Sequence, residues 1–183
     1  MEIVVLCGGI GSRIKSLTRN RVSKPLLEIW GVPHLWRVIN SWRFIGMNRF
    51  TILTGFLNSQ VSQSISSYLI NFPGIDIRII KDRDIGAGTG SAVINAAKYL
   101  DERFLIVNGD SVLSDTVVTK TNFEHACNAL ELNKVACCMY LGKPAWGDNS
   151  NVVLGSSSSV YGYKKERSDV SSNTLFDYGA CLW

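Results

Sequence analysis

Leu6-Cys7-Gly8-Gly9-Ile10-Gly11-Ser12-Arg13 joins an apolar run at the N-terminus to a polar, basic segment. Residues 1–6 are too few and too rich in β-branched side chains for a helix, and they predict a buried strand. The three glycines that follow within four positions remove the Cβ atoms that would keep backbone N–H groups away from a ligand. The stretch therefore predicts a strand that ends in a ligand-binding glycine loop, and the alternative is a tight turn at the strand exit.

The groups beside this loop suit a polyphosphate. Ser12 offers a hydroxyl, Arg13 a planar guanidinium and Lys24 an ammonium. A dinucleotide fingerprint needs another glycine three positions after Gly11, where Ile14 stands, and a Walker loop needs Gly-Lys-Ser/Thr. Both of these phosphate loops are excluded. The missing dinucleotide fingerprint also disfavours a dehydrogenase. For Lys24 the alternative is a solvated surface lysine.

Composition indicates an ordinary globular protein. The 183 residues are 46% hydrophobic and 19% charged, which predicts one domain with a sizeable core. The net charge of +4 is mild and its basic residues are scattered, so no nucleic-acid surface is expected. Glu2 stands where a signal peptide carries positive charge, and no stretch approaches the roughly 20 apolar residues of a membrane span. We expect a cytoplasmic protein whose five cysteines are reduced and buried.

Alternating strand and helix patterns through residue 141 predict an α/β three-layer sandwich with a Rossmann-like, mainly parallel sheet. Pro25 restricts the preceding residue, so Lys24 is expected in an extended segment. Asn58 is expected to cap a helix. From residue 143 onward, short apolar runs between serine-rich turns predict antiparallel strands beside the sheet. Helices are further expected at about 33–46, after residue 91 and at 115–132, and strands at 50–54, 75–79, 104–107 and 135–141.

Two later stretches add candidate site residues. Gly88-Thr89-Gly90-Ser91 opens a helical pattern, and such a loop presents unpaired N–H groups at the positive end of a helix dipole. Asp110 follows the apolar strand at 104–107, and ligands in open α/β sheets collect at the carboxyl ends of strands. The alternatives are a glycine-rich cap for close packing and an ordinary turn aspartate.

The pattern Gly-Gly-x-Gly-x-Arg followed by Lys-Pro resembles the signature of the sugar-1-phosphate nucleotidyltransferases. Gly88-Thr89-Gly90-Ser91-Ala92 and Val107-Asn108-Gly109-Asp110-Ser111 resemble the second nucleotide loop and the metal-binding strand end of that family. Three later blocks resemble its D-glycero-D-manno-heptose 1-phosphate guanylyltransferase branch: Asn151-Val152-Val153, Tyr163-Lys164-Lys165 and Phe176-Asp177-Tyr178-Gly179. The blocks keep the family order over essentially the whole chain.

The resemblance implies the nucleotide-diphospho-sugar transferase fold, with a nucleotide-binding part at 1–141 and a sugar-phosphate-binding part at 142–183. It implies transfer of a nucleotidyl group from a nucleoside triphosphate to a sugar 1-phosphate, with pyrophosphate released. Arg13, Lys24 and Asp110 are the expected catalytic residues, and Asp110 the expected Mg²⁺ ligand. The expected nucleotide contacts are Leu6, Gly8, Gly9, Gly11, Ser12, Arg13, Lys24, Gly88, Thr89 and Asn108. The expected sugar-phosphate contacts are Gly109, Lys164, Lys165, Asp177 and Gly179, and the spacing leaves the choice between the two lysines open.

Two other functions fit the same pattern: a cytidylyltransferase that acts on a non-sugar phosphate, and an inactive nucleotide-binding regulatory module. The base and the sugar cannot be read from the sequence. The family normally continues to a second acidic position at the metal, whereas this sequence ends at Cys181-Leu182-Trp183 inside a strand pattern. The expectation is therefore either a fragment that binds nucleotide with weak or no activity, or a homo-oligomer whose partner copy supplies the missing carboxylate.

Overall fold

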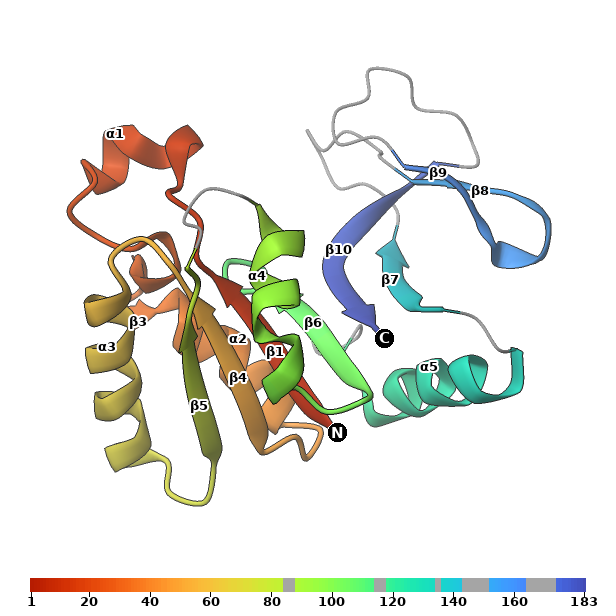
Figure 1. Ribbon diagram of the computed structural model, residues 1–183, viewed down its shortest axis with the longest axis horizontal. Coiled ribbons are helices and arrows are strands. Elements are labelled where there is room, and N and C mark those ends of the chain that lie inside the picture. The colour runs from red at the N-terminus through yellow and green to blue at the C-terminus, as the bar shows by residue number, and fades with distance from the viewer. Residues whose placement is uncertain (84–87, 114–117, 134–135, 143–151, 164–173) are drawn as a thin grey trace.

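A mixed sheet forms the centre of the computed structural model, which describes residues 1–83, 88–113, 118–133, 136–142, 152–163 and 174–183. Its strand order is β5-β4-β1-β6-β10-β8-β9, and β7 also pairs with β10 (Figure 1). The parallel strands are β1 (Glu2–Cys7), β4 (Arg49–Thr54), β5 (Asp76–Lys81) and β6 (Phe104–Asn108). The antiparallel strands are β7 (Cys138–Gly142), β8 (Val152–Leu154), β9 (Val160–Tyr163) and β10 (Thr174–Leu182).

Helices cover both faces of the parallel strands. The helices of the described residues are α1 (Lys15–Thr18), α2 (His34–Arg43), α3 (Asn58–Asn71), α4 (Thr89–Ala96) and α5 (Lys120–Asn133). Helices α2 and α3 pack on one face of the sheet and α4 packs on the other. The 3₁₀ turns are η1 (Ser12–Ile14), η2 (Lys24–Leu26), η3 (Ala97–Tyr99) and η4 (Ser156–Ser158). A short hairpin of β2 (Glu28–Ile29) and β3 (Val32–Pro33) precedes α2.

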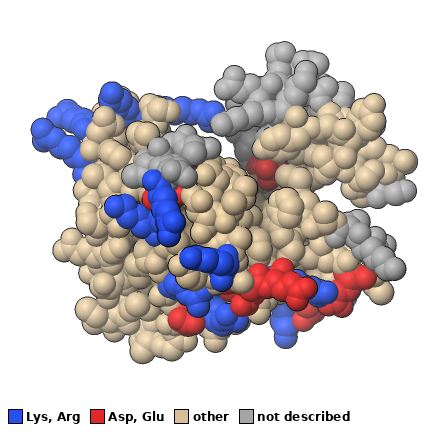
Figure 2. Space-filling view, in the orientation of Figure 1, with Lys and Arg blue, Asp and Glu red and all other residues tan. Residues whose placement is uncertain are grey.

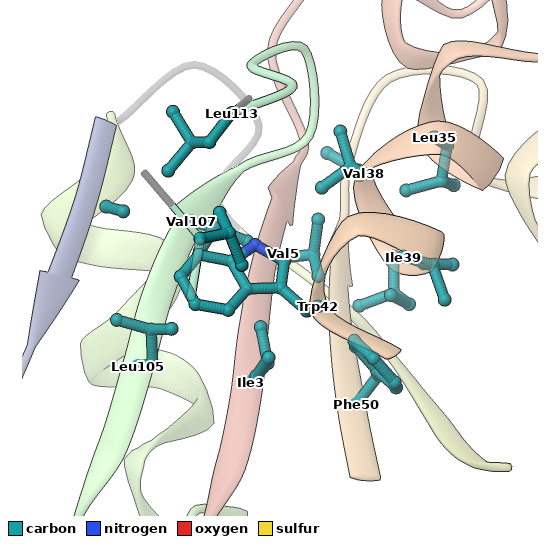
Figure 3. Close-up of a cluster of buried hydrophobic side chains, with 14 of the residues drawn as sticks. Ile3, Val5, Leu35, Val38, Ile39, Trp42, Phe50, Leu105, Val107 and Leu113 are labelled. Carbon is teal, nitrogen blue, oxygen red and sulfur yellow. The ribbon is translucent and has the colours of Figure 1, made fainter. Parts of the chain in front are cut away.

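Strand β1 is buried on both faces because it lies inside the parallel sheet. On one face Ile3 and Val5 join Trp42 of α2 in the main core (Figure 3). Helix α3 also contributes residues to this core. On the other face Val4 packs with Leu53 and with Ala96 of α4. Alternate residues of one strand thus serve two cores, and the predicted three-layer α/β sandwich is confirmed.

The parallel register brings the important loops together. Leu6 pairs with Leu53 of β4 and with Asn108 of β6, so the glycine loop leaves the sheet beside the turn that carries Asp110. On the far side of β6, β10 runs antiparallel, as predicted for the C-terminal region. The carboxyl ends of β1, β4 and β6 therefore meet at one edge of the sheet.

Three local predictions were wrong. Lys24 lies in a 3₁₀ turn with Pro25 rather than in an extended segment: Pro25 stands in the first turn of the 3₁₀ helix, where proline is tolerated, and the extended backbone falls on Ser23 at the N-cap. Asn58 begins α3, and the capping position belongs to Leu57 in left-handed backbone without a side-chain cap. Helix α5 begins at Lys120, five residues after the predicted start, and residues 114–117 lie outside the described part.

The cysteines are free, as predicted, but they are not all buried. Cys7 is buried, whereas Cys127, Cys137, Cys138 and Cys181 are partly exposed. Cys127 lies on α5, Cys138 and Cys181 lie on β7 and β10, and Cys137 directly precedes β7. Among the described residues, no helix is long and apolar enough to cross a membrane.

Candidate functional site

A cavity of about 570 Å³ lies at the carboxyl ends of the parallel strands. Its lining includes every residue predicted to contact a nucleotide, together with the predicted metal ligand: Leu6, Gly8, Gly9, Gly11, Ser12, Arg13, Lys24, Gly88, Thr89, Asn108 and Asp110. Gly109, predicted to contact the sugar phosphate, lines it as well. Residues from four separate loops are therefore brought to one cavity.

The glycine loop is shaped by close backbone contacts. Gly11 has a φ of 71°, and a Cβ added there would lie 3.3 Å from the Cβ of Lys24. At Gly55, a Cβ would lie only 2.7 Å from the carbonyl oxygen of Gly8, so the loop and the end of β4 pack backbone to backbone. That same oxygen accepts a hydrogen bond of 3.2 Å from the N–H of Phe56. The loop is thus fixed to β4 at Gly8 and pressed against Lys24 at Gly11.

The turn that carries Asp110 is attached to the glycine loop. The N–H of Gly109 donates to the carbonyl oxygen of Leu6 at 3.0 Å. A Cβ at Gly109 would lie 2.5 Å from the Sγ of Cys7, so only glycine fits without a shift. Burial, and secondarily the charge of Asp110, raises the pKa of Cys7 far above its usual range. Cys7 is therefore a packing thiol at neutral pH, not a nucleophile.

Lys24 and Asp110 form an ion pair inside the cavity. Both side chains remain about one-third exposed, at 38% and 34%. A phosphate that binds the ammonium of Lys24, or a cation that binds the carboxylate of Asp110, must compete with this pair. The two predicted catalytic groups are thus within reach of each other and of a ligand in the cavity.

One charged residue of the site was missed from the sequence. Asp82 follows the end of β5, lines the cavity and is only 8% exposed. Its N–H donates to the carbonyl oxygen of Thr54 at 2.7 Å, and the amide of Asn95 on α4 donates to its Oδ1 at 2.9 Å. The signal was the one that identified Asp110: an aspartate just past the carboxyl end of a strand. It offers acceptor oxygens on the α4 side of the cavity.

The cavity also has apolar walls and a basic rim. Apart from Asp82, the lining residues that were not predicted as contacts are apolar: Cys7, Ile10, Ile14, Pro25, Leu53 and Ala92. No acidic residue occurs from Ile3 to Leu27, a stretch with five lysines and arginines. Figure 2 shows basic side chains gathered over α1, which follows the glycine loop directly. The electrostatic surroundings favour an anionic ligand.

The predicted sugar-phosphate residues do not all reach this cavity. Asp177 and Gly179 lie on β10 and are absent from its lining, whereas Lys164 and Lys165 lie outside the described residues. Asp177 accepts hydrogen bonds from the N–H of Gly179 at 2.8 Å and from the hydroxyl of Tyr163 at 3.3 Å. Gly179 has a φ of 72° and leaves no space for a Cβ beside the Asn108 side chain. Asn108, which lines the cavity, therefore also lies directly against Gly179.

A divalent cation would find one protein carboxylate at Asp110. In the described part of the chain no three His, Cys, Asp or Glu side chains are grouped to hold a metal. Mg²⁺ is commonly bound by only one or two carboxylates together with substrate phosphates. The donor set at Asp110 therefore fits a cation that arrives with a polyphosphate, and the second carboxylate stays a prediction.

Residues 3–160 match the family model described as the MobA-like NTP transferase domain. The chain belongs to that family. It is 31% identical over 132 residues to the bifunctional protein GlmU of Methanocaldococcus jannaschii, covering 72% of this chain and 30% of that one. It is 24% identical over 141 residues to the D-glycero-alpha-D-manno-heptose 1-phosphate guanylyltransferase of Campylobacter jejuni, covering 77% of this chain and 57% of that one.

A solved structure shares the fold of this MobA-like NTP transferase domain. HddC from Yersinia pseudotuberculosis aligns over 99% of this chain and 75% of its own, with a TM-score of 0.76 and 19% identity. The predicted resemblance to sugar-1-phosphate nucleotidyltransferases is therefore confirmed, and this is a family of enzymes. The chain spans about one-third to three-fifths of the two curated relatives, so the activity of the whole protein belongs to the proposal below.

Proposed function

We propose that this domain condenses a nucleoside triphosphate with a sugar 1-phosphate to give a nucleotide-diphospho-sugar and pyrophosphate. One observation carries the proposal: the glycine loop, Lys24, the Gly88-Thr89 loop and the turn at Asp110 line a single cavity. Backbone N–H groups of a glycine loop, an arginine and a lysine are the donors that a triphosphate requires. The names of the relatives support a sugar phosphate as the second substrate.

The reaction would need no side-chain nucleophile. An oxygen of the sugar 1-phosphate attacks the α-phosphorus and forms a new P–O bond. The bond from the α-phosphorus to the oxygen that bridges to the β-phosphate breaks, and pyrophosphate leaves with that electron pair. The main barrier is to hold two anions in line, and positioning of this kind can contribute roughly 7–11 kcal/mol.

In this proposal Arg13 and Lys24 hold the phosphates and neutralise their charge, with Ser12 and the loop N–H groups around them. Asp110 would hold Mg²⁺, which when bound supplies positive charge to the phosphate oxygens. Because the Lys24–Asp110 ion pair must open for both roles, triphosphate and cation are expected to bind together. Thr89 and Asp82 lie on the side of the cavity toward α4 and are assigned to the ribose and base.

The acceptor is assigned to the C-terminal part, residues 142–183. Asp177 and Gly179 on β10 would contact the sugar, and Lys164 or Lys165 its phosphate, with Gly109 between the two halves. The close approach of Gly179 on β10 to Asn108, which lines the cavity, supports this arrangement.

The test is an array of the five common nucleoside triphosphates against a panel of sugar 1-phosphates, with pyrophosphate release as the readout. We expect release from one preferred pair, dependent on both substrates and on Mg²⁺. A nucleoside triphosphate that binds tightly but releases no pyrophosphate with any acceptor would contradict transfer while leaving the nucleotide site intact.

A further inference from the structure

The segment that leads to Lys24 is held by a side chain from another part of the fold. Gln60, in the first turn of α3, accepts a hydrogen bond of 3.0 Å from the N–H of Ser23 through its Oε1. Its Nε2 donates a hydrogen bond of 2.8 Å to the carbonyl oxygen of Arg21. One amide therefore binds the backbone on both sides of Val22, just before the lysine.

Local hydrogen bonds hold the start of this segment: the N–H groups of Arg19 and Arg21 donate at 2.8 Å to the carbonyl oxygens of Lys15 and Thr18. Residues 19–22 are exposed, and Arg19 and Asn20 both have left-handed backbone, with φ of 48° and 55°. Left-handed conformations are costly for residues other than glycine and persist only where the surroundings hold them. Beyond these local bonds, Gln60 binds the carbonyl oxygen of Arg21 and the N–H of Ser23 at the end of the exposed stretch.

Gln60 itself stands on a rigid base. Val61, next to it, and Ile65, one turn further on, are buried in the main core. The indole N–H of Trp36 on α2 also donates to the hydroxyl of Ser64 at 2.9 Å, which ties α2 to α3. The position of Gln60 is therefore fixed by the core. Its amide in turn holds the backbone of residues 21–23 at a fixed place relative to that core.

The path from Gln60 to the cavity is short. Ser23 is fully buried, and its carbonyl oxygen accepts the N–H of Leu26 at 2.8 Å, which closes the 3₁₀ turn of Lys24. The stem of Lys24 then packs against Gly11, and its ammonium meets Asp110. Displacement of Ser23 would therefore move Lys24 relative to the glycine loop.

We infer that Gln60 is a positioning residue for triphosphate binding, acting through residues 21–23 on Lys24. This inference rests on the proposed phosphate role of Lys24. It assigns a function in substrate binding to a residue of α3 that does not line the cavity.

Titration calorimetry tests it with whichever of ATP, GTP, CTP, UTP and dTTP binds the wild type most tightly. Gln60→Leu removes both hydrogen bonds, whereas Gln60→Glu keeps the size and the acceptor for Ser23 but loses the donor to Arg21. We expect each variant to bind roughly three- to tenfold more weakly, as for one or two lost hydrogen bonds. Gln63→Leu, an exposed residue of the same helix, is the control and should bind as the wild type does.

A double-mutant cycle separates positioning from general damage. In a Lys24→Ala background, Gln60→Leu should weaken the affinity no further, because the group that it positions is gone. Wild-type affinity in folded Gln60→Leu and Gln60→Glu, or an equal loss with and without Lys24, would overturn the inference. If Lys24→Ala alone binds as tightly as the wild type, the proposed phosphate site fails and the inference fails with it.

Discussion

The ammonium of Lys24 and the carboxylate of Asp110 are paired across the cavity that lies at the carboxyl ends of β1, β4 and β6. Each group suits a different part of a metal-triphosphate complex. The lysine can bind the phosphates, and the aspartate can bind the cation. The pair holds the two groups facing each other and competes with both ligands. A ligand that carries both charges can replace it in one step.

Lys24→Met should therefore affect the two ligands in opposite directions. Removing the ammonium frees Asp110, so the affinity for Mn²⁺ added without nucleotide should rise. The affinity for a nucleoside triphosphate should fall, because a charge-assisted contact worth about 1.5–3 kcal/mol is lost. Calorimetric titrations of the variant and the wild type with each ligand measure both effects, and weaker Mn²⁺ binding by the variant would argue against the competition.

Asp110→Asn should abolish Mg²⁺-dependent pyrophosphate release and leave the fold intact. A neutral amide is a much poorer ligand for a hard cation than a carboxylate, and the side chain is one-third exposed. Asp76→Asn is the matched control, because Asp76 is exposed at the amino end of β5, away from the cavity. Turnover by the Asp110 variant that stays normal at limiting Mg²⁺ would make this residue an ordinary turn aspartate.

Asp82→Asn should alter the discrimination between nucleotides and leave phosphate binding unchanged. The carboxylate only accepts hydrogen bonds, so it favours a base or ribose group that donates, and an amide weakens that preference. The ratios of affinity among the five triphosphates should shift by calorimetry. Inorganic tripolyphosphate, which has no base, should bind the variant and the wild type equally; a loss of tripolyphosphate affinity would place Asp82 with the phosphates instead.

Gly109→Ala should destabilise the protein by about 1–3 kcal/mol, as for an overpacked core. The added Cβ would lie 2.5 Å from the Sγ of Cys7 and 2.8 Å from the carbonyl oxygen of Leu6. Cys7→Ala in the same chain should recover part of the loss, since it removes the first contact but not the second. Thermal unfolding measures both, with Gly90→Ala as the control, because a Cβ at Gly90 meets nothing within 4 Å. Equal melting temperatures for Gly109→Ala and the wild type would show that the turn can shift freely.

The features that the sequence predicted best are those that act locally. Strand β1 and the glycine loop are adjacent in sequence. The β-branched residues predicted the strand, and the glycines predicted the loop. The 3₁₀ turn at Lys24 was not predicted, because the rule for a residue before proline favours extended backbone. Ser23, at the start of that turn, also donates its N–H to Gln60, which is 37 positions away in sequence. No local pattern reports a contact of that kind.

Asp82 shows the opposite case, a residue that local reasoning could have found. It follows β5 as Asp110 follows β6, and a strand was predicted there, but β5 is an edge strand with half-exposed residues. Its nearness to the cavity depends on β4 lying between β5 and β1, which is a matter of strand order. The C-terminal assignments to Asp177 and Gly179 depend likewise on the path of β10, and their roles stay predictions.

The central claim is that this cavity binds a nucleoside triphosphate through Arg13 and Lys24. The most direct measurement is calorimetric titration of the wild type, Arg13→Ala, Lys24→Ala and the double variant with the five triphosphates in the presence of Mg²⁺. We expect at least one triphosphate to bind the wild type, and each single variant to lose about 1.5–3 kcal/mol of binding free energy with little change in melting temperature. The double variant should lose more. Unchanged affinity in a folded double variant, or no binding of any triphosphate by the wild type, would contradict it.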